Sequence, residues 1–443
     1  MEKINTINLI DNIILLCLMI LIVVLPVAHT TTIRSITLFL PLLLLCYKMV
    51  LTKSLELKKT PLDIPIILFL LFSVISLFTA VDFEYSLREF RGEALKYFLL
   101  FYLIVNIDFD EERIKKIIAV FFGANVIMVI YGIVEFYYHG GILINPPNPI
   151  YMAKSLHSGG GTYSTYLITI FPFLFFAYYY MEKGILKLLL LILLLFNIFS
   201  IYITHNRGAL IAVLVEIAII LVMTILFFKK KKLGYLILIM SIIVVVSLIT
   251  DKSFFRGEIT NMFAKSEDKV HTPLTARLDV WKFTIKKITE DPLKGTGFGR
   301  MSFYKKYPQF RKKYGHMWHT HNTFLDIAIQ LGVLGLIAFL WLIFRVLKIN
   351  WRLARDSLGF RPEAQSEGKD RPALNQVQGS LSSRFKTYFG LSTFVMVIGF
   401  FMRNMFDDFY VDDSAMLFWF LIGLSVVLYL RRSHETFDSC PGI

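Results

Sequence analysis

"WHTHNTFLDIAIQLGVLGLIAFLWLIF", residues 318–344, places two histidines directly before a long apolar run. As a helix, this run is long enough to cross the roughly 30 Å of hydrocarbon in a bilayer. Apolar runs of similar length recur throughout the 443-residue chain. Hydrophobic residues make up 56% of the chain and charged residues 18%, and the mean hydropathy is +0.61. An ordinary soluble domain carries about 25% charged residues, so the pattern predicts an all-α polytopic membrane protein.

Windows of about 19 residues predict about twelve transmembrane helices. Basic residues gather in alternate connections, and four consecutive lysines follow the eighth predicted helix, at 229–232. Because cytoplasmic loops carry the excess of Lys and Arg, both termini are predicted to be cytoplasmic. The predicted spans lie near residues 9–28, 35–52, 62–80, 94–107, 117–138, 162–181, 186–204, 209–228, 233–250, 323–347, 388–406 and 414–430.

Two long connections divide the predicted spans. Residues 251–322 form a loop domain on the outer, periplasmic side, after transmembrane helices 1–9 in residues 1–250. Residues 323–443 hold helices 10–12. Between helices 10 and 11, residues 356–384 are rich in Gly, Pro, Gln, Ser and charge and have no apolar period. Such a composition buries too little apolar surface to offset the entropy of ordering, so we expect a disordered cytoplasmic insertion.

This orientation places His319 and His321 at the outer membrane surface, just before the tenth span. Asn322 or Thr323 is suited to cap that helix, and Asp326 stands at the acidic position of a capping box. The sequence therefore predicts two histidines held at the start of a helix, outside the hydrocarbon.

Arg207 lies where the seventh predicted span ends and the eighth begins almost at once. Gly208 is predicted to permit the reversal of the chain there. An arginine near bilayer depth costs about 2.5 to 3.5 kcal/mol on insertion scales and is by default a functional candidate. The alternative is that its side chain extends to lipid headgroups.

The outer loop contains a predicted amphipathic helix that begins at Arg277 and ends at Asp291 and Pro292. Its apolar face is expected to lie on or near the membrane. The glycine-rich GTGFG at 295–299 lacks the preceding strand and the following Lys-Ser/Thr of a phosphate-binding loop, so we interpret it as a turn. The apolar residues spaced for one helix face are Leu278, Trp281, Ile285 and Ile288.

Arg207, Arg277 and His321 are thus three cationic or protonatable groups on one predicted face of the membrane. The fork of a guanidinium matches two phosphate oxygens and keeps its charge. Histidine titrates near pH 6.5 and accepts a proton at neutral pH. The set predicts a pyrophosphate held at headgroup level by the arginines, with proton transfer by the histidine.

Three stretches, THNRGALIA, ARLDVWKFTIKKITEDPLKGTGFG and HTHNTFLDIAIQLGVLG, resemble the O-antigen ligase/polymerase superfamily of bacterial envelope glycosyltransferases. The three stretches occur in the order, and at the positions between the predicted spans, that are typical of this superfamily. The resemblance implies a GT-C-type membrane fold and a glycan donor on undecaprenyl pyrophosphate. It also implies that Arg207 and Arg277 bind the pyrophosphate and that His321 helps to activate the acceptor hydroxyl, without metal or nucleotide. Leu336 follows Gly335 where a threonine often stands in the ligase branch, which leaves a polymerase open.

The favoured function is a metal-independent ligase that transfers the glycan to lipid A-core on the periplasmic face of the inner membrane. One alternative is an O-antigen or exopolysaccharide polymerase that uses a lipid-linked repeat as acceptor, and another is a transporter of lipid-linked glycan. Transport favours polar groups at mid-span and broken helices, whereas the spans here are mostly apolar. The expected partners are donor, acceptor and membrane lipids, with no cofactor and no nucleic acid.

Other polar residues have competing interpretations. His316, His319 and His321 form H-x2-H-x-H, but zinc usually needs a fourth ligand and supporting hydrogen bonds, and no matching cluster stands out. We therefore predict no metal, and interpret His319 as a residue that supports His321, together with Asn322. Aromatic residues and cations alternate in KKYPQFRKKYG at 305–315, and outside a membrane that pattern favours attachment to anionic lipids.

Arg88 and Arg91 are candidates to assist a phosphate, although nearby glutamates are spaced to pair with them on a helix. The acidic DDFYVDD at 407–413 is interpreted as a solvated turn between the last two spans.

Overall fold

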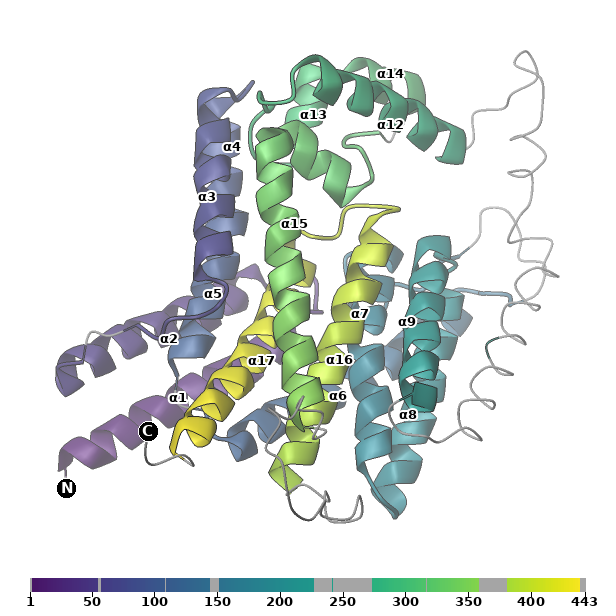
Figure 1. Ribbon diagram of the computed structural model, residues 1–443. Helices are drawn as coiled ribbons and strands as arrows, with labels where there is room; N and C mark the ends of the chain where they lie inside the picture. The colour runs from purple at the N-terminus through teal and green to yellow at the C-terminus, as the bar shows by residue number, and fades with distance from the viewer. Residues whose placement is uncertain are drawn as a thin grey trace, which may run out of the picture.

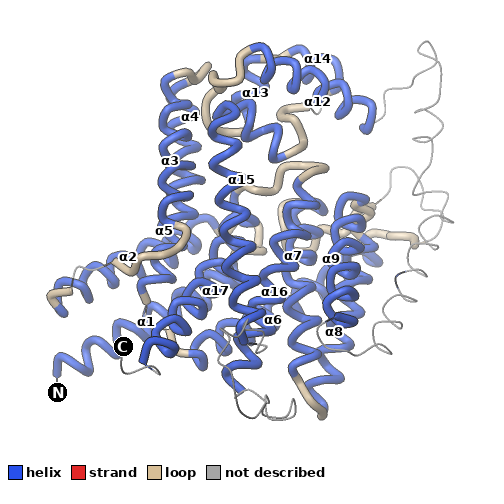
Figure 2. Tube along the Cα trace, viewed as in Figure 1, coloured by secondary structure: helices blue, strands red, loops and turns tan. Residues whose placement is uncertain are grey.

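The computed structural model describes residues 2–54, 57–107, 109–143, 151–226, 241, 273–315, 317–357 and 381–438. These residues form helices and loops, and none of them lies in a strand (Figure 2). The helices are α1 (Glu2–Val24), α2 (Thr31–Thr52), α3 (Asp63–Phe78), α4 (Phe83–Phe90), the π-helical turn η1 (Arg91–Leu95), α5 (Lys96–Asn106), α6 (Glu111–Tyr138), α7 (Gly160–Tyr180), α8 (Ile185–Ile203), α9 (Arg207–Leu226), α12 (Pro273–Glu290), α13 (Met301–Lys306), α14 (Gln309–Tyr314), α15 (Thr323–Ser357), α16 (Leu381–Asn404) and α17 (Asp412–Asp438).

Within the described part of the chain, 9 helices are long and apolar enough to cross a membrane, and α3 is a shorter apolar helix. The chain is therefore a multi-pass, helical membrane protein, as predicted. The predicted span 94–107 corresponds to the short α5, and 233–250 lies almost wholly outside the described residues. The count of twelve spans stays a prediction. Helix extends into both ends of the predicted insertion 356–384, and the rest of that insertion lies outside the described residues.

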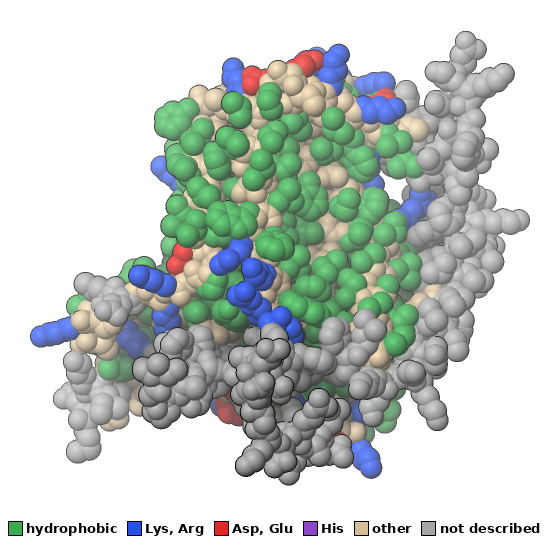
Figure 3. Space-filling view, viewed as in Figure 1, with side chains coloured by type: hydrophobic (Ala, Val, Ile, Leu, Met, Phe, Trp, Pro, Cys, Tyr) green, Lys and Arg blue, Asp and Glu red, His purple; other side chains and the backbone are tan. Residues whose placement is uncertain are grey.

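The long helix α15 runs through the bundle and packs on α3, α16 and α17, while α16 also packs on α7 and α9 (Figure 1). Helices α12, α13 and α14 lie together across the end of the bundle at which α15 begins (Figure 1). On the face shown in Figure 3, a broad hydrophobic band separates charged side chains over α13 and α14 from others nearer the opposite end. This pattern fits a bundle whose middle lies in hydrocarbon.

An aromatic interface joins α17 to α5 and determines the position of the loop 405–411. The indole ring of Trp419 is 1% exposed and lies 4.8 Å from the ring of Phe98 between centroids. Its Nε1–H donates a hydrogen bond to the hydroxyl of Tyr410 at 2.8 Å. Edge-on aromatic pairs of this kind stabilise beyond the area they bury. Because Tyr410 belongs to the 405–411 loop, the buried interface anchors that loop.

Helix α15 is broken at Gly332, whose φ of 77° and ψ of 175° interrupt the helical backbone. The loop after α12 supplies the replacement hydrogen bonds. The N–H of Val333 donates to the carbonyl of Pro292 at 2.8 Å, and the N–H of Thr296 donates to the carbonyl of Ile329 at 2.8 Å. The predicted turn at GTGFG is confirmed, and it seats the outer helices on the break in α15.

Gly295→Ala is expected to loosen this joint, because a Cβ at Gly295 would overlap the backbone carbonyl of Gln330. Overpacking against an interior typically costs about 1 to 3 kcal/mol. We expect a lower midpoint of thermal unfolding in detergent, followed by tryptophan fluorescence. Gly123→Ala in α6 is the control, since no atom lies within 4 Å of its Cβ position. Equal midpoints for the two variants would contradict this account.

The face of α12 that packs against protein differs from the predicted apolar face, whose position on or near the membrane stays a prediction. The buried side chains are Ala276, Val280 and Thr284, whereas Ile285 is 51% exposed. Ala276 and Val280 pack on Phe303, Met317 and Ile329. The buried face of α12 therefore packs against residues of the segment that runs from α13 into α15. The aromatic side chains of 305–315 join the same small core, which accounts for their alternation with the cations. Helix α12 also begins at Pro273, one turn before Arg277.

Candidate active site

His321 sits in a strained loop that two capping interactions hold in place. Its φ is 52°, in the left-handed region that non-glycine residues occupy at a cost. Next to it, Asn322 Oδ1 accepts hydrogen bonds from the N–H groups of Phe324 at 3.0 Å and Leu325 at 3.1 Å. Asn322 Nδ2 donates to the carbonyl of Met405 at 3.1 Å. Asn322 therefore caps α15, as predicted, and also ties His321 to the 405–411 loop.

Asp407 orients the imidazole of His321 from that loop. Asp407 Oδ1 lies 2.9 Å from His321 Nδ1. Burial alone would raise the pKa of Asp407, but the hydrogen bond from His321 and the charge of Arg403 outweigh it and hold this pKa well below its usual range. Because the carboxylate is ionised and only accepts, His321 Nδ1 carries the hydrogen of this contact.

His319 lies against His321, with the ring centroids 4.1 Å apart. Its side chain is buried, and its Nδ1 lies 3.1 Å from Asp326 Oδ2. Burial lowers the pKa of His319 to about 4, helped by the charges of Arg300 and Arg277 against the opposing aspartates 407 and 408. His319 is therefore neutral at pH 7 and does not compete as a cation for Asp407. Asp326 accepts from the N–H of Thr320 at 3.0 Å, instead of completing a capping box.

The low pKa of His319 predicts that the folded protein loses stability in acid. An unfolded histidine titrates near 6.5, and folded His319 titrates at about 4. Between these values the unfolded chain binds a proton that folded His319 does not, so stability falls as the pH falls through this window. We expect the unfolding midpoint in detergent to drop between pH 6.5 and 4, and to drop less in His319→Gln. An identical pH dependence in both proteins would be evidence against this prediction.

Arg403, near the end of α16, is a site residue that the sequence analysis missed. Its side chain is 1% exposed. Among the described residues, its Nε and Nη2 have no hydrogen-bond partner, and the nearest carboxylate oxygen, Asp407 Oδ2, is 3.9 Å from Nη2. Nε and Nη2 form the edge of a guanidinium that binds two oxygens of a phosphate or carboxylate side by side. Burying such donors without partners is costly, so this open edge favours an anionic ligand.

Arg277 reaches the same region from α12. Trp281, one turn further along α12, donates from Nε1 to the carbonyl of Thr320 at 2.8 Å, which docks the helix on the histidine loop. The positive charge of Arg277 contributes to the lowered pKa of His319, in agreement with this placement. Arg277 Nε is also buried without a hydrogen-bond partner among the described residues. The structure thus brings Arg277 to the two histidines, as predicted.

Arg207 is the first residue of α9, in the short turn after α8, as predicted. Asn206 caps this helix, with Oδ1 accepting from the N–H of Ala209 at 3.2 Å. The left-handed residue in the turn is His205, with φ of 48°, so the role predicted for Gly208 is wrong. Gly208 instead allows close packing, because a Cβ there would lie 3.1 Å from Arg403 Nη1. The start of α9 therefore adjoins Arg403, which adjoins Asp407 and His321.

The interpretation of 407–413 as a solvated turn is wrong for Asp408, Tyr410 and Val411, which are buried. Asp408 is 4% exposed and accepts from Thr323 Oγ1 at 2.7 Å. Burial raises the pKa of Asp408, and the neighbouring Asp326 adds to the effect. Arg300 Nη1 donates to the carbonyl of Asp408 at 3.2 Å. These three charged side chains and Glu93 line a cavity of about 30 Å³, with room for about one or two water molecules.

Arg88 and Arg91 do not join this site. Both are exposed, on α4 and η1, and line a shallow surface hollow with Glu84. The arginine in the buried cluster is Arg300, which the sequence analysis did not single out. Local helical spacing does not distinguish an arginine that faces outward from one that a distant loop brings inward.

Among the residues that the structure describes, two groups of side chains have the ligand types for a metal ion: His319 with His321 and Asp407, and His319 with Asp326 and Asp408. In each group the ligand atoms lie within 4.8 Å of one another. A cation in the first group would displace the hydrogen bond between His321 and Asp407 and would sit beside Arg403, with unfavourable repulsion. His316, of the competing zinc interpretation, lies outside the described residues.

A known protein family matches a segment of the chain that contains some of the site residues. Residues 189–340 match the family model described as O-Antigen ligase. Over this segment the chain is similar to the O-antigen ligase family. The segment contains Arg207, Arg277 and His321, whereas Arg403 and Asp407 lie beyond its end. The resemblance seen in the sequence is confirmed over residues 189–340.

Curated relatives of this chain carry the name "Putative polysaccharide ligase". The Rickettsia felis protein is 38% identical over 78 residues, which covers 16% of this chain and 19% of the relative. The Rickettsia bellii protein is 33% identical over 97 residues, covering 20% of this chain and 23% of the relative. The chain thus aligns with about a fifth of the length of these relatives.

Proposed function

We propose that this protein is a metal-independent glycosyltransferase that moves a glycan from undecaprenyl pyrophosphate to lipid A-core. One observation carries the proposal: the buried Nε–Nη2 edge of Arg403, with no hydrogen-bond partner among the described residues, lies beside Asp407, which orients the imidazole of His321. The unfilled donors suit a pyrophosphate, and the imidazole of His321 suits proton removal from a hydroxyl. The match of residues 189–340 to the O-antigen ligase family model supports a glycan as the transferred group.

The proposed reaction is a direct displacement. The oxygen of the acceptor hydroxyl attacks the anomeric carbon of the donor, and its proton passes to Nε2 of His321. The bond from that carbon to the pyrophosphate oxygen breaks, and the lipid pyrophosphate leaves with the electron pair. Arg207, Arg277 and Arg403 stabilise the charge that grows on the leaving group, typically worth a few kcal/mol per contact. Displacement of this kind inverts the anomeric centre.

We propose that the site faces the periplasm, at the outer surface of the inner membrane, with both termini in the cytoplasm. The alternation of basic residues between the spans supports this orientation. The site lies at the end of the bundle that α12 to α14 cover (Figure 1). A lipid-linked donor and a lipid A-core acceptor both present their polar parts at such a surface.

The test uses the full chain in nanodiscs with undecaprenyl-pyrophosphate glycan and lipid A-core, and follows transfer by a gel mobility shift. We expect transfer by the parent, and strong loss in Arg207→Ala and Arg277→Ala. Lengthening of the glycan on the donor lipid alone would instead identify a polymerase, the alternative that Leu336 leaves open. Donor binding without either product would favour transport.

Excess EDTA is expected to leave the initial rate of transfer unchanged, because arginines and His321 supply the charge stabilisation and the proton acceptor in this mechanism. The measurement compares initial rates before and after prolonged chelation, with and without added Zn²⁺ or Mg²⁺. A loss of activity that one of these ions restores would assign a metal to the histidine and aspartate groups and would contradict the proposal.

A further inference from the structure

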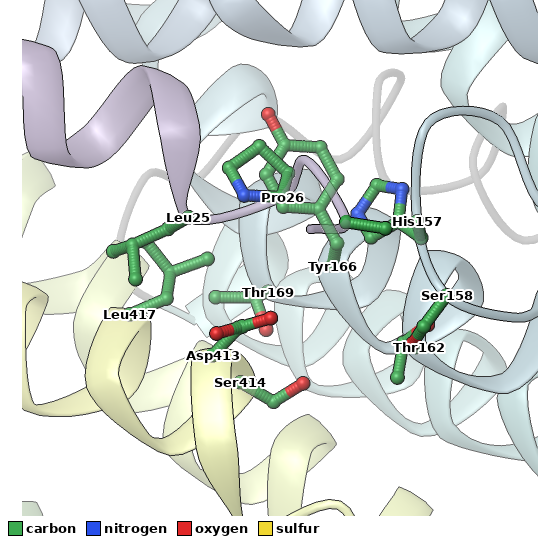
Figure 4. A pocket seen from close by; sticks show the side chains of 11 residues that line it. Leu25, Pro26, His157, Ser158, Thr162, Tyr166, Thr169, Asp413, Ser414 and Leu417 are labelled. Carbon is green, nitrogen blue, oxygen red and sulfur yellow. The ribbon is translucent and has the colours of Figure 1, made fainter. Parts of the chain in front are cut away.

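A second polar pocket lies beyond the 405–411 loop from His321. Its walls come from the end of α1, the segment that enters α7 and the start of α17 (Figure 4). Phe409 lies near both places. Its ring is 4.4 Å from the guanidinium of Arg403, and it packs so close to Gly161 that a Cβ there would overlap the ring. Thr162, the residue after Gly161 in α7, lines the pocket.

The lining of this pocket combines hydroxyl groups with one imidazole and one neutralised carboxylate. The carboxylate is Asp413, which forms an ion pair with Arg34. Figure 4 shows Asp413 and Ser414 projecting from α17, and His157 and Ser158 from the segment that enters α7. Such a lining offers donors and acceptors without a net charge, which suits an uncharged polyol better than an ion.

His157 has the buried polar atoms that indicate a ligand in this pocket. The residue is 8% exposed, and both of its ring nitrogens are buried without a well-formed hydrogen bond among the described residues, although the backbone of Lys154 approaches the ring. Burial lowers the pKa of His157 to about 3, so the ring is neutral and has one donor and one acceptor. A hydroxyl group also donates and accepts one hydrogen bond each. Leaving both nitrogens buried and unpaired is costly, and a bound hydroxyl would remove that cost.

The size of the pocket limits what enters it. Its volume is about 20 Å³, which is room for about one water molecule or one hydroxyl group. Ser158 is exposed and Asp413 partly exposed, so these two residues form the rim. A sugar ring would therefore rest at the rim and insert a single hydroxyl or hydroxymethyl arm.

We propose that this pocket is a saccharide subsite, which binds a hydroxyl or hydroxymethyl group of the glycan substrate beside His157. The proposal rests on the proposed function, in which the sugar joined to pyrophosphate lies at His321. The next sugars of the chain would then pass Phe409 and reach the pocket. The subsite adds affinity for the glycan and takes no part in bond breaking.

The test measures glycan binding separately from transfer. The probes are the core oligosaccharide and the delipidated O-antigen polysaccharide, both released from lipopolysaccharide by mild acid. Dissociation constants come from ligand-observed NMR with the full chain in nanodiscs. We expect His157→Phe, which fills the pocket, to weaken binding of one of these glycans about tenfold, and Ser158→Ala to weaken it about threefold. His157→Gln, which keeps a donor and an acceptor, should retain most of the affinity.

Binding of inorganic pyrophosphate, measured on the same samples, should be equal in the parent and the His157 variants. Equal glycan affinity in the parent and His157→Phe would overturn the subsite, as would the absence of glycan binding by the parent. If His157→Phe unfolds, Ser158→Ala and His157→Gln decide the question by the same comparison. Glycan binding that depends on His157, in a protein with neither pyrophosphate binding nor transfer, would keep the subsite and reject the proposed transferase.

Discussion

His321→Ala is expected to lower the rate of glycan transfer by about 10²- to 10⁴-fold, because no other group in the proposed mechanism takes the proton of the acceptor hydroxyl. In Asp407→Asn the rate of glycan transfer is expected to fall by about 10²-fold or more, although the substitution keeps the size of the side chain. An asparagine that turns its amide N–H toward Nδ1 stabilises the tautomer with the proton on Nε2, which leaves no base facing the hydroxyl. Initial rates at saturating donor, with the unfolding midpoint of each variant, provide the measurement.

The control for this prediction is His139→Ala. His139 is exposed, outside the site, and its ring stacks on Tyr151 at 5.0 Å. The His139→Ala variant should transfer glycan at the parent rate. Because Asp407→Asn removes a charge without removing volume, it also separates orientation from packing. Full activity in Asp407→Asn would show that the 2.9 Å contact between Asp407 and His321 has no part in the reaction.

Arg403→Met distinguishes a role in binding pyrophosphate from a role in supporting the fold. If Arg403 binds pyrophosphate, the variant should lose activity without losing stability. Nε and Nη2 of the buried Arg403 have no hydrogen-bond partner among the described residues. Replacing such a poorly paired buried charge by an apolar side chain is often neutral or stabilising. The unfolding midpoint should therefore stay level or rise. Loss of one contact to the leaving pyrophosphate should lower transfer by about 10²- to 10³-fold. Titration with inorganic pyrophosphate should show weaker binding in the variant.

Arg345→Met is the matched control for Arg403→Met. The guanidinium of Arg345 donates from Nη2 to the carbonyl of Pro61 at 2.9 Å, so its donors are in use. This variant should lose stability and keep its affinity for pyrophosphate. If Arg403→Met instead unfolds at a lower temperature and binds pyrophosphate as the parent does, Arg403 is a structural support for Asp407.

Several features of the fold could be predicted because they depend on neighbours along the chain. Long apolar runs indicate membrane helices, since hydrocarbon leaves the backbone no other partners. The cap at Asn322, the turn at 295–299 and the position of Arg207 at the start of a helix also follow from short-range patterns. The three residues predicted for the site, Arg207, Arg277 and His321, were selected by residue type and by position at the ends of helices.

The order of residues along the chain is enough to predict the class of protein, most of its helices and the residue types at one end of the bundle. The contact of Asp407 with His321 and the buried, open edge of Arg403 depend on tertiary packing, because these residues meet where α16 and α17 pack on α15. An acidic run such as DDFYVDD has the same composition whether it is solvated or buried. Its environment depends on Trp419 and Tyr410, which anchor the loop, and on α12, whose buried face is set by contacts with distant helices.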